Sequence, residues 1–396
     1  MDLFEKCSRF DRANQLKRSG LYPYFLEISE NHTEEVIVDG RPMVMIGSNN
    51  YLGLTHHPKV TAAAIAAVEK YGSGCTGSRF LNGTLDLHVE LERRLAKFMR
   101  HESVITFSTG FQVNLGVIST LAGKGDVILC DRENHASIFD GCRLSYAQLR
   151  KYRHSDMEDL ERQLKECPDS AGRLIITDGV FSMKGDLCDL PSIVQLARRY
   201  GARILLDDAH GIGVLGKNGR GTAEHFGLED KIDVVVGTFS KSFASLGGFA
   251  AGKTEVIEYV KHLARSLIFS ASPAPASAAA TLAALEVVES EPERRTRLWA
   301  NVSRMNAAFT DLGWDVSMSH SPIVPLAIGS DHDTFSFWSR LHEAGIFTNP
   351  VVSPAVPPGE GLLRTSYMAT HTPEELDRVI EAFAQIGRAT GVVRVA

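Results

Sequence analysis

Short apolar runs alternate with stretches of helical character through most of the chain. The apolar runs are rich in β-branched residues, and they cover positions 104–107, 127–130, 174–177, 204–206 and 234–236. The helical stretches include positions 114–122, 157–166 and 190–200. Strands that are apolar throughout and separated by helices indicate a mostly parallel sheet with both faces covered. The pattern therefore predicts an α/β fold.

The N-terminal part of the chain has a different pattern. Residues 1–34 are polar with helical tendencies, and residues 36–38 and 43–46 flank an Asp39-Gly40 pair. Asp-Gly between two apolar runs is typical of a β-hairpin turn, and Pro42 favours an edge position. We expect an N-terminal segment of helix and hairpin over residues 1–46.

The C-terminal part predicts a smaller α+β unit. An Ala-rich run at 275–288 predicts a long helix, and the charged run 291–297 predicts a solvated helix face. Beyond it, strands are expected near 323–328 and 362–366, and helices near 333–344 and 373–386. We therefore expect a large domain over residues 47–288 and a small C-terminal domain over residues 289–396.

Composition narrows the class of protein. The 396 residues are 44% hydrophobic and 23% charged, which excludes a disordered or fibrous chain. A formal net charge of −6 argues against a nucleic-acid binder. No signal-peptide core, no uncharged apolar run of roughly 18 residues and no C-x-x-C pair occurs. We expect a cytoplasmic protein with reduced thiols, and peripheral contact with the inner face of the cell membrane stays open.

Two motifs suggest other chemistry, but neither has the required context. The letters GSGCTG at 72–77 match G-x-G-x-x-G, yet they follow a helical run instead of a strand. A nicotinamide site is therefore not expected, and a flexible loop or a loop on the substrate side is the better interpretation. The adjacent His56 and His57 lack the spacing of helical metal ligands, so no metal site is expected.

Polar residues follow each of the five predicted strands. In parallel sheets these carboxyl ends meet at one edge, where ligands bind. After the first strand comes a small-residue turn containing Gly110 and Phe111, before a helix expected to begin near Val113. The residues after the other four strands are His135, then Ser182, then Asp207 with His210, then Thr238 with Ser240 and Lys241.

These residue types fit pyridoxal phosphate (PLP). A lysine amine forms a Schiff base with the PLP aldehyde, and a carboxylate keeps the pyridine nitrogen protonated so that the ring accepts electrons. Lys241 and Asp207 are the candidates for these two roles. A helix N-terminus with nearby hydroxyls suits the phosphate. The imidazole of His135 can lie on the ring face, and that of His210 can approach the ring hydroxyl.

The ordered motifs resemble those of the α-oxoamine synthases, a family of fold-type-I PLP enzymes. The similarity extends from residue 47 to about residue 392, and its marks are SNNYLGL (48–54), TGF (109–111), NHASI (134–138), DGVFSM (178–183), DDAH (207–210), GTFSK (237–241), FSAS (269–272) and LR (363–364). Within the family, GSRFLNGT (77–84) and NPVVSPAVP (349–357) are most similar to the bacterial serine palmitoyltransferases. Two departures stand out. Asp208 replaces the common Glu, and Val352 or Ser353 stands where some members carry an Arg.

The resemblance implies a fold and a set of roles. The fold is aspartate-aminotransferase-like, and Lys241, His135, Asp207 and His210 act as catalytic residues on PLP. The backbone amides of Gly110 and Phe111 and the hydroxyls of Thr238 and Ser240 hold its phosphate, and Ser182 also belongs to the cofactor site. Ser270 reaches the phosphate of the neighbouring subunit, which implies a homodimer. Asn49 and Arg364 bind substrate, with Arg364 on the carboxylate.

The implied reaction is a decarboxylating condensation of L-serine with a long-chain acyl-CoA such as palmitoyl-CoA. Its products are 3-ketosphinganine, CoA and CO2, and it begins sphingolipid synthesis. Two related activities stay open, namely that of glycine C-acetyltransferase and that of 8-amino-7-oxononanoate synthase. The residues alone do not fix the choice between serine, glycine and alanine, the acyl-chain length or the residues that bind CoA.

Overall fold

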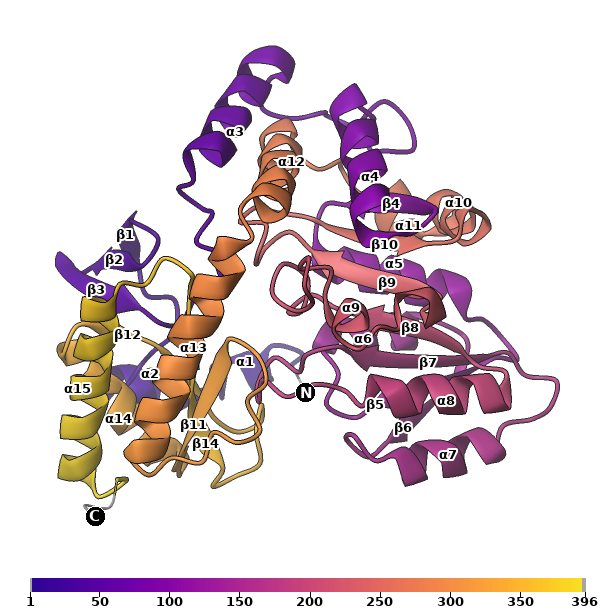
Figure 1. The fold of residues 1–396 in the computed structure, drawn as a ribbon. Coiled ribbons are helices and arrows are strands. Elements are labelled where there is room, and N and C mark those ends of the chain that lie inside the picture. Colours follow the sequence, from indigo (N-terminus) through magenta and orange to yellow (C-terminus); the bar gives the residue numbers. More distant parts are fainter. Residues whose placement is uncertain (1, 394–396) are drawn as a thin grey trace. The chain divides into compact units, whose positions relative to one another are not determined.

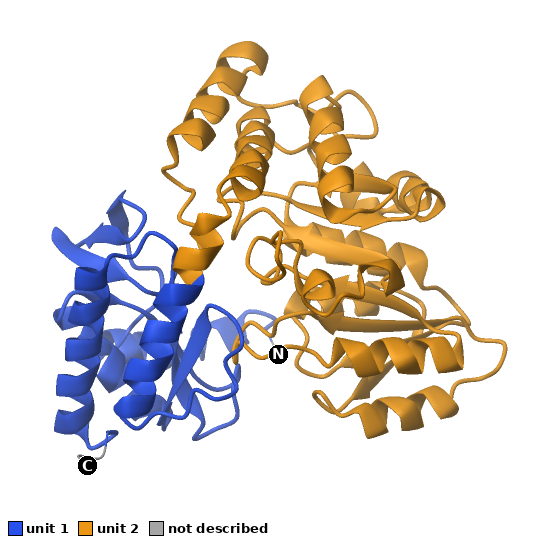
Figure 2. Cartoon of the chain, viewed as in Figure 1, with its two compact units in different colours: residues 1–48, 299–396 blue, residues 49–298 orange. Residues whose placement is uncertain are grey.

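The computed structural model describes residues 2–393. Contacts divide the chain into two compact units, a large unit of residues 49–298 and a small unit of residues 1–48 and 299–396 (Figure 2). Both ends of the described chain thus belong to the small unit. The predicted three-part division at 46/47 and 288/289 stays a prediction.

A seven-stranded sheet forms the centre of the large unit (Figure 1). In spatial order its strands are β4 (Ser103–Phe107), β10 (Gly248–Gly252), β9 (Val234–Thr238), β8 (Arg203–Asp207), β7 (Arg173–Asp178), β5 (Val127–Asp131) and β6 (Gln148–Tyr152). Strand β10 is antiparallel to both of its neighbours, and the other adjacent pairs are parallel. The carboxyl ends of six strands therefore lie at one edge, where β10 begins. The predicted mostly parallel sheet is confirmed.

The five predicted strands are all present, with ends within two residues of those expected. Strands β6 and β10 were not predicted. β6 is an edge strand whose sequence, QLRKY, is largely polar because only one neighbour covers it. β10, with the sequence GFAAG, has no β-branched residue. A Cβ on its first residue, Gly248, would lie 2.8 Å from the Cα of Gly110, so close packing favours small residues there.

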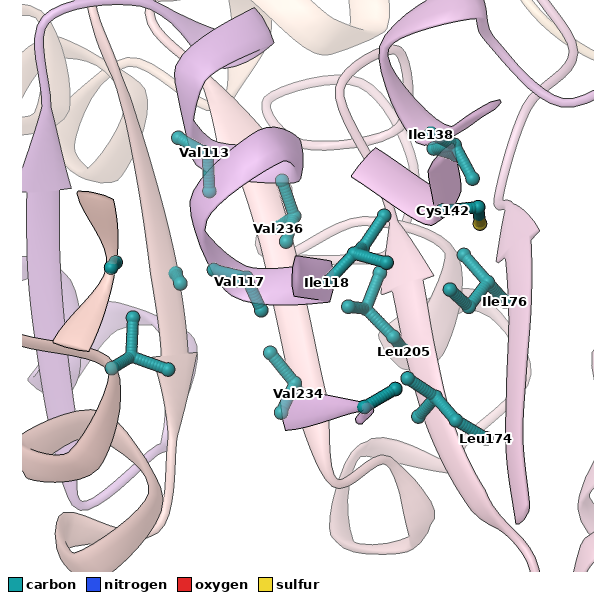
Figure 3. Close-up of a cluster of buried hydrophobic side chains, with 14 of the residues drawn as sticks. Val113, Val117, Ile118, Ile138, Cys142, Leu174, Ile176, Leu205, Val234 and Val236 are labelled. Carbon is teal, nitrogen blue, oxygen red and sulfur yellow. The ribbon is translucent and has the colours of Figure 1, made fainter. Parts of the chain in front are cut away.

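Helices cover both faces of this sheet. The helices of the large unit are α3 (Pro58–Tyr71), α4 (Asp86–Met99), α5 (Gly110–Leu121), α6 (Ala136–Leu144), α7 (Met157–Lys165), α8 (Leu190–Tyr200), α9 (Thr222–His225), α10 (Thr254–Leu263), α11 (Arg265–Ile268) and α12 (Pro275–Ser290), with a 3-10 turn at Glu229–Lys231. Helices α5 and α6 pack on one face, and α7 and α8 lie over the other (Figure 1). Val113, Val117 and Ile118 of α5 and Ile138 of α6 meet the apolar side chains of β7, β8 and β9 (Figure 3).

Helix α5 begins three residues before the expected Val113. Thr109 caps it, because its Oγ1 accepts a hydrogen bond from the amide of Gln112 at 3.1 Å. Threonine is a good N-cap, and this signal places the helix start directly after β4. The N-terminus of α5 therefore lies at the carboxyl edge of the sheet.

The small unit contains two further sheets. Its elements are α1 (Glu5–Ser8), α2 (Arg12–Arg18), β1 (Ile28–Asn31), β2 (Glu35–Val38), β3 (Arg41–Met45), β11 (Ile323–Gly329), α14 (Asp331–Glu343), β12 (Ile346–Phe347), β13 (Asn349–Val351), β14 (Gly361–Ser366) and α15 (Pro373–Thr390). One sheet has the order β1-β2-β3-β12 and the other the order β11-β14-β13. The strands and helices expected in this part of the chain are all present.

The predicted hairpin is confirmed, but the edge position of Pro42 is wrong. Asp39 and Gly40 have φ values of 50° and 70°, as the hairpin turn requires. Strand β3 lies between β2 and β12, so it is an interior strand. The amides of Val44 and Ile46 donate to the β12 side, at Gly345 and Phe347. The nitrogen of Pro42 faces the same side by alternation, before the first paired residue of β12, and its missing N–H costs no ladder bond.

Strands β2 and β3 share an apolar cluster with the C-terminal part of the chain. Val36, Val38, Met43 and Met45 are buried together with Met368, and Phe347 packs against them. The parallel pairing of Val44 with Ile346 joins the same two regions.

The charged run at 291–297 leads into α13 (Glu293–Asp311), as expected, but one of its side chains is not solvated. Arg295 is buried, and its guanidinium donates to the carbonyls of Val288 and Lys217 at 2.8 and 3.2 Å. These two bonds replace the water that a surface arginine would have. None of the helices within residues 2–393 has the length and hydropathy that crossing a membrane requires.

Candidate active site

A cavity of about 270 Å³ lies at the carboxyl edge of the large unit's sheet. Nine of the twelve predicted site residues line it: Gly110, Phe111, His135, Ser182, Asp207, His210, Thr238, Ser240 and Lys241. They come from five separate strand ends, which the sheet order brings together. The cavity is therefore the candidate active site.

The N-terminus of α5 forms one wall of the cavity. Among the described residues, no protein group accepts a hydrogen bond from the amides of Gly110 and Phe111, because the first amides of a helix have no carbonyl one turn earlier. The Thr109 cap takes only the amide of Gln112. Free amides and the helix dipole favour an anion here. A Cβ on Gly110 would lie 2.8 Å from Oγ1 of Thr238, so only glycine lets these two elements approach this closely.

Hydroxyl groups stand beside that helix terminus. Thr238, the last residue of β9, has its Oγ1 2.9 Å from Oγ of Ser240, and it donates to the carbonyl of Gly247 at 3.1 Å. Lys241 follows directly and also lines the cavity. The turn after β9 thus presents a lysine next to an anion-binding wall.

Asp207 ends β8 on the cavity wall and is buried. Its Oδ2 accepts a hydrogen bond from the side-chain amide of Asn114 at 2.6 Å, and its Oδ1 accepts from the backbone amide of Ala209 at 3.1 Å. Asn114 also donates to Oγ of Ser137 at 2.9 Å. The carboxylate is therefore held in one orientation by donors on two elements.

A second carboxyl group, Asp178, ends the neighbouring strand β7 directly beside Asp207. Burial and the charge of Asp207 raise the pKa of Asp178 well above its usual range, although the amide of His135 donates to its Oδ2 at 2.9 Å. Two adjacent carboxylates in a dry site do not both ionise readily. Burial beside the charge of Asp207 therefore favours the protonated form of Asp178.

His135 caps helix α6 and presents its ring to the cavity. Its Nδ1 lies 2.7 Å from Oγ of Ser137, which fixes the ring orientation. Burial and the nearby Lys241 lower the pKa of His135, against the opposing charge of Asp207. A neutral flat ring is suited to stacking on an aromatic cofactor.

His210 is positioned by a residue from another part of the large unit. The hydroxyl oxygen of Tyr51, whose side chain is fully buried, lies 2.7 Å from Nδ1 of His210. The same hydroxyl lies 3.3 Å from Oδ1 of Asn49. Asn49 does not line the cavity, but this contact places it next to a residue that orients the cavity wall.

Two predicted site residues lie elsewhere. Oγ of Ser270 accepts a hydrogen bond from the side chain of Gln112 on α5 at 3.1 Å, and Ser270 does not line the cavity. Arg364 is a buried residue of β14 in the small unit, where its carbonyl accepts from Thr348. Their expected roles toward a partner subunit and a substrate stay predictions.

The GSRFLNGT block at 77–84 supports the segment that carries Ser270. The amide of Ser272 donates to the carbonyl of Gly77, and its hydroxyl donates to the carbonyl of Gly83 at 2.6 Å. Arg79 is buried in an ion pair with Glu92 at 2.6 Å. The motif at 72–77 follows helix α3 and precedes α4, so its context is not that of a dinucleotide site.

Four residues of the site escaped prediction as functional: Asn114, Ser137, Asp178 and Tyr51. Asn114 gave a usable signal, because it interrupts an otherwise apolar helix face. Asp178 and Tyr51 stood in recognised motifs without an assigned role. Asn114, Ser137 and Tyr51 are not residue types that PLP chemistry requires by itself, and the carboxylate role had been given to Asp207.

The donor set fits PLP. The free amides of α5 and the hydroxyls of Thr238 and Ser240 suit its phosphate, Asp207 its pyridine nitrogen, His135 its ring face and Lys241 its aldehyde. The missing side chain of Gly110 lets the hydroxyl of Thr238 lie close to the N-terminus of α5, so the amides and the hydroxyl can serve one phosphate group. Within residues 2–393 no cluster of three or more His, Cys, Asp or Glu side chains is arranged to hold a metal ion.

This fold and site define a PLP-dependent transferase of fold type I. The family model Aminotransferase class I and II matches residues 41–383, and the chain belongs to that family. Among individual proteins it is similar to the serine palmitoyltransferase of Sphingobacterium spiritivorum, at 50% identity over 97% of this chain and 96% of that one. It is also similar to the 8-amino-7-oxononanoate synthase of Symbiobacterium thermophilum, at 45% identity over 97% and 98%.

A solved structure shows the same fold. It is a serine palmitoyltransferase from S. paucimobilis with a bound PLP–myriocin aldimine, and its TM-score to this chain is 0.96. The two sequences are 37% identical, and the match covers 99% of this chain and 100% of that one. The predicted fold class and cofactor are confirmed.

Proposed function

We propose that this chain condenses L-serine with a long-chain acyl-CoA such as palmitoyl-CoA, releasing CoA and CO2 and yielding 3-ketosphinganine. The observation that carries the proposal is the arrangement of Lys241, Asp207 and His135 around one cavity, in a chain 50% identical to a serine palmitoyltransferase. The activity of 8-amino-7-oxononanoate synthases, which are less similar at 45% identity, is the alternative.

PLP supplies an electron sink that stabilises negative charge at the Cα of a bound amino acid. The charge of Asp207, fixed by Asn114, keeps the sink protonated at its ring nitrogen. The Lys241 amine takes the Cα proton of the amino acid as general base and later returns a proton to the product. His135 restricts the tilt of the ring, because Ser137 fixes its own orientation.

The remaining predicted residues bind and orient. Gly110, Phe111, Thr238 and Ser240 hold the phosphate, and His210 approaches the ring hydroxyl. Ser182 is a further contact of the cofactor. Asn49 contacts the amino acid, and Arg364 holds its carboxylate in a charge-assisted pair. Ser270 reaches the phosphate held by a second copy of the chain, so the active form is a homodimer.

Two lysine-to-alanine variants, one in the cavity and one on the surface, test the proposal. Purified protein carrying PLP is mixed with palmitoyl-CoA and L-serine, and free thiol release is followed. We expect Lys241→Ala to lose the cofactor's visible absorption band and thiol release together. Lys231→Ala, in the exposed Asp230–Lys231 pair, serves as the control and retains both. Full thiol release by Lys241→Ala would contradict the proposal.

Substrate choice is tested with the same assay. We expect the absorption band to shift with L-serine, and thiol release to depend on L-serine and not on glycine or L-alanine. A response to L-alanine with pimeloyl-CoA would instead establish the alternative activity. The predicted location is the cytoplasm, with peripheral contact at the inner face of the cell membrane. Sedimentation with phospholipid vesicles tests the membrane contact, because bound protein would appear in the pellet.

A further inference from the structure

A second cluster of ionisable side chains lies beside the cavity residues, around His154 at the end of β6. Nδ1 of His154 lies 3.0 Å from Oδ1 of Asp131, the last residue of β5. Its Nε2 lies 2.8 Å from Oδ2 of Asp186 and 3.7 Å from Oε2 of Glu133. The side chains of His154, Asp131 and Asp186 are only 14%, 2% and 6% exposed. The proposed chemistry uses none of these groups.

Both ring nitrogens of His154 face carboxylate oxygens, so both must carry hydrogen to form these bonds. Burial alone lowers the pKa of His154, but the hydrogen bonds to Asp131 and Asp186 and the charges of Asp131 and Glu133 raise it to about 9. The ring therefore carries a positive charge at neutral pH. It also packs edge-to-face against Phe181, with ring centroids 4.4 Å apart.

The cluster holds one particular loop, residues 179–188, which we call the Ser182 loop. Inside it the amide of Phe181 donates to the carbonyl of Asp186, the amide of Gly185 donates to the carbonyl of Phe181, and Val180 pairs with Leu187. From this loop Asp186 reaches His154, and Nζ of Lys184 lies 2.9 Å from Oε1 of Glu133. Two charged contacts thus tie the loop to the residues that follow β5 and β6.

The Ser182 loop contributes to the cavity. Val180 and Ser182, the two neighbours of Phe181 in the sequence, both line it. Ser182 is only three residues from Gly185, whose amide closes the loop, and four from Asp186. A loop without helix or strand depends on such contacts to keep a side chain in place.

We propose that His154 is a positioning residue, which clamps the Ser182 loop through Asp131 and Asp186 and thereby holds Ser182 at the cofactor. The part that concerns the cofactor rests on the proposed function, because it takes Ser182 as a cofactor contact. The clamp itself depends on the loop geometry alone.

Hydrogen exchange of the PLP-bound protein tests the clamp. His154→Phe keeps a ring against Phe181 but removes both N–H groups, so we expect the amides of residues 181–188 to exchange about 10-fold faster. Arg150→Gln is the matched control, since Arg150 also lies on β6 but donates to the carbonyls of Gln163 and Glu166. It should leave the exchange of the Ser182 loop unchanged. Asp186→Ala removes the same contact from the loop side. It should reproduce the faster exchange even if His154→Phe folds poorly. Unchanged exchange in both variants would overturn the inference.

A double-mutant cycle tests whether the clamp acts through Ser182. The dissociation constant of PLP and the position of its absorption band are measured for His154→Phe, Ser182→Ala and the double variant. We expect His154→Phe to weaken PLP binding, and to have little further effect when Ser182 is already alanine. Fully additive effects would show that His154 merely stabilises the fold, which overturns the inference. A failure of the proposed reaction would appear in the thiol assay and leave both readouts interpretable.

Discussion

The hydroxyl oxygen of Tyr51 lies 2.7 Å from Nδ1 of His210, in a part of the large unit where Tyr51 is completely buried. This contact fixes the orientation of the His210 ring, which lines the cavity. Tyr51 thus holds in place a ring that faces the candidate active site.

Tyr51→Phe removes this hydrogen bond with little change in volume. We expect kcat/KM for L-serine to fall about 5–10-fold, the usual effect of one lost buried hydrogen bond. The pH dependence of the cofactor's absorption band should also move, because the ring of His210 loses the contact that orients it. Tyr200→Phe, whose hydroxyl contacts Glu161 at 2.9 Å, is the matched control. An absorption titration identical to that of the unmodified protein would contradict the assignment.

Asn114→Ala tests the support of Asp207. The lost bond joins an amide to a buried carboxylate, and such charge-assisted bonds are worth about 1.5–3 kcal/mol. We therefore expect kcat to fall by 10-fold or more while the protein remains folded. Asn218→Ala removes an exposed amide that contacts Glu224 and should leave kcat unchanged. Equal rates in the two variants, measured by thiol release, would count against this role.

Gly110→Ala tests the phosphate wall. Its new Cβ would lie 2.8 Å from Oγ1 and 3.0 Å from Cβ of Thr238, so helix and strand must separate. We expect PLP to dissociate at least 10-fold more readily, since the free amides of α5 move with the helix. At Gly123, beyond the other end of α5, an added Cβ would have its nearest neighbour 4.0 Å away, at Oδ2 of Asp126. Gly123→Ala should bind PLP normally in the same spectroscopic titration.

Asp208 makes stability depend on pH. Its carboxylate is fully buried and accepts hydrogen bonds from the amide and hydroxyl of Thr222, both at 2.6 Å. Burial, with a further contribution from the charge of Asp207, raises the pKa of Asp208 to about 7 against the lowering effect of Thr222. A carboxyl group with a raised pKa in the folded state stabilises the fold most at pH values below its pKa in the unfolded chain, which is near 4. This stabilisation is lost as the pH rises through 7.

Asp208→Asn removes this titration while keeping the shape. The unfolding free energy of the variant minus that of the unmodified protein should rise by about 2–3 kcal/mol from pH 5 to pH 8. Urea unfolding at both pH values measures the difference. Asp169→Asn, at a fully exposed position, should show no such gain. A constant difference between Asp208→Asn and the unmodified protein would refute the assignment.

Asp208 also accounts for one departure from the family pattern. Its oxygens lie within 2.1 Å of the Cβ positions that Gly211 and Gly221 lack. The longer side chain of a glutamate would not fit this space without moving the turn that holds Thr222. The shortening and the glycines therefore belong to one local arrangement.

The cavity was largely predictable because the topology of the sheet determines where most of its residues lie. Five apolar runs sufficed to place His135, Asp207 and Lys241 at one edge, since parallel strands point their carboxyl ends the same way. The supporting residues could not be placed in this manner. Asn114 meets Asp207 only through the way α5 packs on the sheet, and Tyr51 meets His210 across 159 positions of the chain.

Strand β10 shows a different limit of sequence reasoning. Gly and Ala are poor strand formers, yet β10 pairs with β4 and β9 along its whole length. Packing beneath α5 overrides propensity there. The buried Arg295 shows another limit. The charged run predicted a helix, but it did not indicate that backbone carbonyls accept hydrogen bonds from the Arg295 guanidinium.

The pairing of β3 with β12 has a consequence for synthesis on the ribosome. The apolar side chains of Val36, Val38, Met43 and Met45 emerge early, whereas Phe347 and Met368 that cover them emerge roughly 300 residues later. At about 5–20 residues per second, the nascent hairpin waits roughly 15–60 s for its partners. Throughout that interval it presents an apolar face to which chaperones can bind, and a chain that stalls before β12 leaves that face exposed to aggregation.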